Sequence, residues 1–182
     1  MKKLKNKLNL KVAIPKRIEE KQISLSCSVT SIDCSHIIDD IYISGYRASL
    51  DYAFLIGNNF THIINCAGGS KTFFPLYFKE FKYYEIELRD DGNINITDTI
   101  VKFISFLKQV TQDKKNKILI HCSEGISRAP ALVCSYLMWK CNMDSKTAIN
   151  FIKEKRKCVD INLGFLFQLE NLSLHREILR AI

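Results

Sequence analysis

The sequence lacks any long apolar run. Its uncharged apolar stretches fall well short of the roughly 18 residues that a membrane-spanning helix needs, and the N-terminus has no apolar stretch of the kind found in signal peptides. Internal repeats and low-complexity tracts are also missing. We therefore expect a globular protein of the cytoplasm, or of the nucleus, that has no membrane span.

The cysteines and histidines show no pattern typical of disulfides or metal sites. The seven cysteines are odd in number, their spacings do not repeat, no Cys-x-x-Cys pair occurs, and the four histidines are scattered. In a chain without a secretion signal, this argues against a disulfide framework and against a structural zinc site. We expect most cysteines to be small buried residues, and we expect no metal or other cofactor.

Positive charge is concentrated at one end of the chain. The net charge is +8 over 182 residues, and the first 21 residues supply eight lysines and arginines against two glutamates. These first residues show no convincing periodicity, whereas the whole has the composition of an ordinary globule. The sequence therefore predicts a basic N-terminal arm at residues 1–30 and one globular domain at residues 31–182.

From Ile37 onward, strand patterns alternate with helix patterns. Asp144 and Asn162 are the expected N-caps of the last two helices. Such alternation favours an α/β fold with a central, mostly parallel sheet flanked by helices, and ligands bind these sheets beyond the carboxyl ends of the strands. Strands are predicted at 41–43, 61–66, 83–88 and 117–121, and helices at 48–56, around 100–107, and at 128–140, 145–156 and 163–179.

Cys122 stands at such a strand end and is followed by a short loop and a helix. A loop of this length can curl until its backbone N–H groups point at one spot, where the dipole of the next helix also favours an anion. Gly125 permits the positive φ that a tight curl needs, and Arg128 can hold two phosphate oxygens at once. We therefore predict a phosphate-binding loop made of Ser123, Glu124, Gly125, Ile126, Ser127 and Arg128.

These surroundings favour the thiolate of Cys122 over the thiol. A thiolate there can attack phosphorus in line, while Arg128 and the backbone stabilise the charge of the transferring group. A plain buried thiol is the alternative, and the strand before the cysteine, the glycine within the loop and the helix after it argue against that alternative. A rhodanese-type sulfur-transfer protein also uses a loop cysteine, but the glycine and arginine positions fit a phosphatase loop better.

The stretch His121-Cys122-x-x-Gly125-x-Ser127-Arg128 resembles the active-site loop of the dual-specificity phosphatases, within the cysteine-based protein tyrosine phosphatase superfamily. Two further stretches resemble the family's first core strand and its final-helix motif: Asp40–Ile43 and Asn162-x-Gly164-Phe165-x-x-Gln168-Leu169. The resemblance implies the family's fold, a metal-free two-step mechanism through a cysteinyl phosphate, and phosphoprotein substrates.

The resemblance also implies a general acid upstream of the nucleophile. The family supplies an aspartate from a loop after a strand, and that spacing points to Asp90 as the third catalytic residue beside Cys122 and Arg128. Asp91 is adjacent and stays open as the alternative. Without the loop motif, both would be interpreted as solvated carboxylates of a turn. His121 is interpreted as structural, orienting the cysteine loop through a hydrogen bond.

One position departs from the family. A serine or threonine usually follows the loop arginine and donates a hydrogen bond to the nucleophilic sulfur, but this chain has Ala129 there. A methyl group cannot donate, so the departure predicts a slow breakdown of the phosphoenzyme. Ser127 is the other hydroxyl that could serve as the donor.

Phosphoproteins are the predicted substrates. The loop has Glu124 and no cation besides Arg128, whereas a site for a highly charged inositol phosphate would need more. A short domain implies a shallow pocket that admits phosphoserine and phosphothreonine as well as phosphotyrosine. The alternatives are a phosphate-binding module with little turnover and an RNA 5′-phosphatase, although no aromatic and basic interleaving indicates nucleic-acid binding.

The basic arm suggests one partner. Lysines followed by Leu8 and Leu10 resemble the docking peptides that bind mitogen-activated protein kinases, with the lysines meeting an acidic groove. A disordered, solubilising arm is the alternative.

Overall fold

The computed structural model describes residues 32–68 and 78–182. The predicted arm at residues 1–30 lies outside these residues, so the division into arm and domain stays a prediction. Among the described helices, none combines the length and the apolar character that a bilayer crossing requires.

Five strands of the described chain form one sheet, in the order β1-β2-β5-β3-β4. β1 pairs with β2 in antiparallel fashion, and the other three pairings are parallel. This confirms the predicted α/β fold with a mostly parallel sheet; β1 was not predicted. The strands are β1 Cys34–Ile38, β2 Ile41–Ser44, β3 His62–Asn65, β4 Lys82–Glu85 and β5 Ile118–His121.

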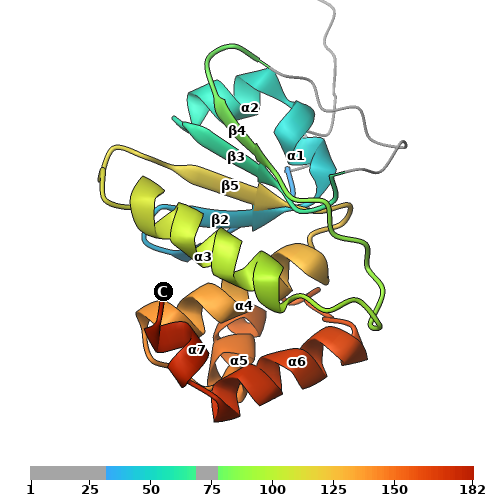
Figure 1. The fold of residues 1–182 in the computed structure, drawn as a ribbon. Coiled ribbons are helices and arrows are strands. Elements are labelled where there is room, and N and C mark those ends of the chain that lie inside the picture. The colour runs from blue at the N-terminus through green and yellow to red at the C-terminus, as the bar shows by residue number, and fades with distance from the viewer. Residues whose placement is uncertain (1–31, 69–77) are drawn as a thin grey trace, which may run out of the picture. The chain divides into compact units, whose positions relative to one another are not determined.

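Helices cover both faces of the sheet (Figure 1). Apolar residues of the first two helices, Ala48 and Leu55, pack with Ile63 and Leu119 on one face. The larger core lies on the other face, where Ile43 and Ile120 meet the remaining helices. The helices are α1 Tyr46–Leu50, α2 Tyr52–Gly57, α3 Thr97–Val110, α4 Arg128–Lys140, α5 Ser145–Lys155, α6 Leu163–Leu174 and α7 Glu177–Arg180.

Three predicted elements differ most from the structure in their bounds. The helix expected at 48–56 is divided because Asp51 adopts an extended conformation and caps α2, accepting a hydrogen bond from the Phe54 N–H. The helix expected at 163–179 ends at its C-cap His175, and α7 follows. The strand expected at 83–88 ends at Glu85. The predicted N-caps Asp144 and Asn162 are confirmed, since both accept a hydrogen bond from a first-turn N–H.

The register of the parallel strands sets the position of the site. Ser44 of β2 and Asn65 of β3 both stand opposite His121 of β5, so the three strands end at one edge of the sheet. Cys122 follows His121 directly and therefore lies at the carboxyl edge, where open α/β sheets bind their ligands.

Candidate active site

The loop from Ser123 to Ser127 directs its carbonyl groups outward. The Ser123 carbonyl accepts a hydrogen bond from the Tyr46 N–H at 3.0 Å, and the Ile126 carbonyl accepts one from the Asp160 N–H at 3.0 Å. The two carbonyls between them, those of Glu124 and Gly125, accept hydrogen bonds from Arg156 at 3.0 and 2.8 Å. Four consecutive peptide oxygens are thus held by the surrounding structure.

This arrangement sets the direction of the loop's N–H groups. A trans peptide is planar, and its N–H points opposite to its C=O. With the carbonyls of residues 123–126 turned outward, the N–H groups of residues 124–127 turn inward, toward the centre of the curl. Inward N–H groups followed by the N-terminus of α4 form a concave site for an anion.

Gly125 is required at the tightest point of the curl. Its φ is +68°, a conformation that other residues adopt at a cost. A Cβ at this position would also lie 2.5 Å from the Ser44 carbonyl oxygen and 2.8 Å from Arg156 Nη2. The predicted role of this glycine therefore has two structural reasons, of which the sequence indicated only the first.

Arg156 supports the loop by binding its outward-facing carbonyls. The sequence did not predict this role. Its side chain is 2% exposed. Besides the two loop carbonyls, its guanidinium binds both carboxylate oxygens of Asp33, at 2.7 and 2.6 Å. In the sequence this arginine is one of several basic residues at a helix end, where such residues are usually solvated, so no local signal distinguishes it.

Arg128 keeps a buried, unpaired donor, Nε, for a ligand. Its Nη1 donates to the Leu88 carbonyl at 3.2 Å and its Nη2 to Ser123 Oγ at 2.6 Å. Nε is buried with no hydrogen-bond partner among the described residues, and its nearest anion is Asp90 Oδ2 at 3.7 Å. An unpaired buried donor is costly, and a phosphate oxygen in the curl would supply the missing acceptor.

Asp90 lies beside this curl, within a small hydrogen-bond network. Ser127 Oγ donates to Asp90 Oδ1 at 2.7 Å, and Asn162 Nδ2 donates to the same oxygen at 2.6 Å. The Asn162 N–H in turn donates to Ser127 Oγ at 3.1 Å. A hydroxyl has a single proton, so Ser127 in this arrangement donates to Asp90 and has none for Cys122.

Asp91 occupies a different environment. Its Oδ1 accepts hydrogen bonds from the N–H and the side-chain amide of Asn93, at 3.0 and 3.1 Å. Such bonds are typical of an aspartate that closes a turn. Asp90 lines the hollow around Cys122, whereas Asp91 is not among its lining residues. The geometry therefore favours Asp90 over Asp91 as the candidate general acid.

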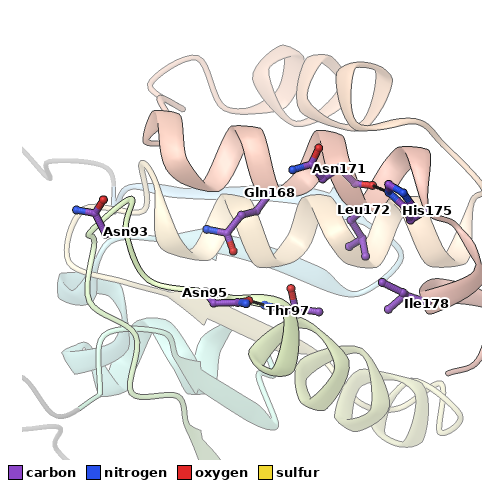
Figure 2. A pocket seen from close by; sticks show the side chains of 8 residues that line it. All are labelled: Asn93, Asn95, Thr97, Gln168, Asn171, Leu172, His175 and Ile178. Carbon is purple, nitrogen blue, oxygen red and sulfur yellow. Dashed lines mark hydrogen bonds between the residues drawn. The ribbon is translucent and has the colours of Figure 1, made fainter.

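The loop that contains Asp90 rests on α6. Gln168 Oε1 accepts from the Ile96 N–H and its Nε2 donates to the Ile94 carbonyl, both at 2.8 Å. Figure 2 shows Gln168 at the edge of a second hollow, of about 360 Å³, which it shares with Asn95 and Thr97. Closer to the site, Gly92 and Gly164 touch so closely that a Cβ on Gly164 would lie 2.1 Å from the Gly92 oxygen.

Cys122 is 2% exposed and lines a hollow of about 590 Å³. The predicted residues Asp90, Ser123, Glu124, Ile126, Ser127 and Arg128 line the same hollow. His121 lies outside it: its Nδ1 is 3.3 Å from the Cys122 carbonyl. Burial lowers the pKa of His121 to about 4, so the imidazole is neutral at physiological pH and Nδ1–H is the donor, as expected of a structural histidine.

The arrangement brings a nucleophile, an anion-binding loop, a guanidinium and a carboxylate to one hollow. Predicted residues from two distant segments, Asp90 and the 122–128 loop, meet there. The contacts of Asn162 and Gly164 with the Asp90 loop were not predicted, because the sequence indicated only a helix start at these positions.

Comparison with known proteins agrees with this geometry. The family model for the dual-specificity phosphatase catalytic domain matches residues 41–173. The chain is 34% identical over 138 residues to the protein-tyrosine-phosphatase MKP1 of Arabidopsis thaliana, covering 75% of this chain and 17% of the relative. It is 36% identical over 154 residues to a MAP kinase phosphatase with leucine-rich repeats, protein 3, of Dictyostelium discoideum, covering 84% and 17%.

Solved structures share the fold. The human tyrosine phosphatase-like serine/threonine/tyrosine-interacting protein superposes with a TM-score of 0.72 at 24% identity, over 80% of this chain and 98% of that one. DUSP15 superposes with a TM-score of 0.72 at 22% identity, over 82% and 94%. The chain spans about a sixth of the length of the two curated relatives named above. It belongs, by its catalytic domain, to the dual-specificity phosphatase family within the cysteine-based protein tyrosine phosphatases.

Proposed function

We propose that the protein hydrolyses phosphotyrosine, phosphoserine and phosphothreonine in proteins through a cysteinyl phosphate on Cys122. The observation that supports this most strongly is the outward-turned carbonyl series of the 123–127 loop. It leaves the N–H groups of residues 124–127 turned inward, and Arg128 adds its unpaired Nε. Family membership and the names of the curated relatives agree with this activity.

In the first step the Cys122 thiolate attacks phosphorus, and the bond to the substrate oxygen breaks. Arg128 and the inward N–H groups hold the three equatorial oxygens, where charge is stabilised at the transition state. Asp90, held by Ser127 and Asn162, gives its proton to the departing oxygen. In the second step Asp90 takes a proton from water, the water oxygen attacks phosphorus, and Cys122 leaves as the thiolate with release of inorganic phosphate.

The direct test uses phosphopeptides with the three phosphorylated residues and an aryl phosphate. We expect phosphate release from all four, and a phosphorylated Cys122 after rapid quenching. Cys122→Ser is expected to abolish turnover and to keep vanadate affinity, because the cradle consists of backbone and Arg128. Turnover that survives Cys122→Ser would reject the mechanism. Vanadate binding by the unaltered protein without any turnover would support the phosphate-binding module instead.

The basic arm is proposed as a docking segment for a mitogen-activated protein kinase. Two curated relatives from Dictyostelium discoideum are named MAP kinase phosphatases, and the arm combines lysines with Leu8 and Leu10. Deletion of residues 1–11 is expected to keep aryl phosphate turnover and to weaken kinase binding, most clearly at low salt. Unchanged kinase affinity after the deletion would reject docking.

A further inference from the structure

The rim of the catalytic hollow is apolar on the side of α6. Leu163 and Leu166 line the hollow, and Phe167 follows Leu163 by one helical turn. The side chains of Leu163 and Phe167 are 83% and 65% exposed. Residues four apart on a helix are neighbours, so these side chains form an apolar strip that continues from the hollow onto the surface. We call Leu163, Leu166 and Phe167 the α6 strip.

The position of the strip is set by the same contacts that hold the general acid. Asn162 precedes Leu163, and its side chain binds Asp90 at 2.6 Å while capping α6. Figure 1 shows the first turn of α6 beside the loop between β4 and α3. A substrate whose leaving oxygen faces Asp90 therefore extends past this turn. Apolar surface that adjoins a binding site in this way is typical of a contact surface.

The remainder of the rim is acidic. Glu124 and Asp160 line the hollow, and both are exposed. Among the described residues that line it, Arg128 is the only cation, and that cation faces the phosphoryl group. A second phosphate or a carboxylate close to the scissile group would therefore meet two negative charges without compensation. A lysine or arginine there would be attracted.

We propose that the substrates are phosphoprotein segments with a large apolar side chain close to the phosphorylated residue and a lysine or arginine nearby. The apolar side chain packs on the α6 strip, and the basic side chain pairs with Glu124 and Asp160. The proposal rests on the proposed phosphatase activity and specifies its substrate class. Leu163 and Phe167 act as specificity-determining residues through packing, and Asp160 acts through charge.

Four phosphotyrosyl peptides of equal length provide the test. They combine leucine or alanine at one flanking position with lysine or glutamate at another. We expect kcat/KM to be about tenfold higher with leucine than with alanine, which corresponds to ~1.4 kcal/mol. We expect a severalfold preference for lysine over glutamate that shrinks as salt is added, since exposed charges are screened.

Variants assign each preference to its residues. The double variant Leu163→Ser, Phe167→Ser is expected to reduce the leucine preference to about twofold or less. Asp160→Asn is expected to reduce the lysine preference, and it keeps the backbone N–H that donates to the Ile126 carbonyl. Leu174→Ser is the matched control: Leu174 is 74% exposed on the same helix, about 16 Å farther along the axis. It is expected to change neither ratio and to leave aryl phosphate turnover unchanged.

The outcomes separate the two proposals. Normal aryl phosphate turnover with equal rates on the four peptides, or with faster turnover of the glutamate peptides, overturns the substrate class alone. The same holds if Leu163→Ser, Phe167→Ser lowers all four rates equally, or if Leu174→Ser abolishes the leucine preference. No turnover of the aryl phosphate or of any peptide overturns the proposed function and, with it, this inference.

Discussion

The two loops that meet at the hollow are held in different ways. The phosphate loop, residues 122–128, joins a buried strand directly to a helix, and its carbonyls are bound by backbone N–H groups and by Arg156. The acid loop, residues 88–95, is positioned chiefly by α6, through Asn162, Gly164 and Gln168. The first is formed by consecutive residues, and Tyr46, Arg156 and Asp160 bind its carbonyls. The second depends on residues about 70 positions away in the chain.

Because the two loops are held by different residues, we expect that anion binding and proton transfer by Asp90 can be impaired separately. Damage to the phosphate loop is expected to weaken both anion binding and every chemical step, since the inward N–H groups act throughout. Damage to the contacts with α6 is expected to spare anion binding and to slow only those steps in which Asp90 gives or takes a proton. Variants of the supporting residues can therefore show whether the two loops are independent.

The largest effect is expected from Arg156→Met. This change leaves the carbonyls of Glu124 and Gly125 without their donors, and bonds from a charged donor contribute about 1.5–3 kcal/mol each. We expect the free energy of unfolding to fall by roughly 3 kcal/mol, and turnover of every substrate to fall by at least ~100-fold, as when a preorganised donor site is lost. Urea unfolding and vanadate titration measure the two effects.

Asp33→Asn is the matched control for this variant. Asp33 binds the same guanidinium, but its side chain is 66% exposed, so the loss is expected to stay below ~1 kcal/mol with turnover nearly unchanged. The hydrogen bond from Arg156 lowers the pKa of Asp33. The stability that this pair contributes is therefore present at neutral pH and is lost as the pH falls below about 4. An Asp33→Asn variant as impaired as Arg156→Met would show that the ion pair, not the carbonyl contacts, supports the loop.

The second prediction separates Asp90 from Asp91. Asp90→Asn is expected to slow formation of the phosphoenzyme from phosphotyrosine by about 100-fold, measured by rapid quenching, and to slow its formation from an aryl phosphate with a good leaving group much less, because that oxygen departs without a proton. Vanadate affinity is expected to stay close to that of the unaltered protein. Asp91→Asn serves as the control and is expected to change the rate by less than about threefold. The opposite ranking would assign the acid to Asp91.

The contrast between the phosphate loop and the acid loop also explains how much of the candidate site the sequence could predict. Cys122, Gly125 and Arg128 lie within seven consecutive residues, so the strand, the turn and the helix that position them are visible as one pattern. The choice of Asp90 over Asp91 rested on a family resemblance, since both fit a turn. The structural argument for Asp90 comes from Ser127 and Asn162, which contact it across 37 and 72 positions.

The errors in the fold have a related cause. β1 was missed because Cys34–Ile38 is a short, half-exposed strand at the sheet edge, with an irregular register beside β2. The break at Asp51 was missed because the apolar pattern on both sides fits one helix, while the cap that divides it is a local hydrogen bond to Phe54. Arg156 was missed because burial of a charged side chain depends on tertiary partners, here two carbonyls and Asp33.

The third prediction concerns the glycine pair between the acid loop and α6. Gly164→Ala places a Cβ 2.1 Å from the Gly92 oxygen, so one of the two backbones must move. We expect formation of the phosphoenzyme from phosphotyrosine to slow by about tenfold, with a smaller change for the aryl phosphate and little change in vanadate affinity. Gly57→Ala is the control, because a Cβ there meets nothing within 4 Å. Equal losses on both substrates would indicate that the phosphate loop moves with the acid loop.

The smallest effect is expected at Ala129, which lies in the first turn of α4, directly after Arg128, and is 0% exposed. Members of the family usually have a hydroxyl at this position that donates to the sulfur. Ser127 does not replace it here, because its proton is directed to Asp90 Oδ1 at 2.7 Å. The Cys122 sulfur therefore lacks a hydroxyl donor from either residue.

Loss of one hydrogen bond to a charged group corresponds to ~1.5–3 kcal/mol, or one to two decades in rate. Breakdown of the phosphoenzyme needs the thiolate as its leaving group, so we expect this step to limit turnover. Rapid-quench kinetics should then show a burst of leaving group followed by a slow steady state. Ala129→Ser is expected to recover only part of this difference, because the surrounding side chains are packed around a methyl group. It should raise the steady-state rate severalfold and reduce the burst, and Ala131→Ser, at another fully buried position of the same helix, should not. If the unaltered protein shows no burst and Ala129→Ser leaves the steady-state rate unchanged, another donor must stabilise the sulfur. Ser123 would then be the next residue to examine, since its Oγ accepts from Arg128 and keeps its own proton to donate.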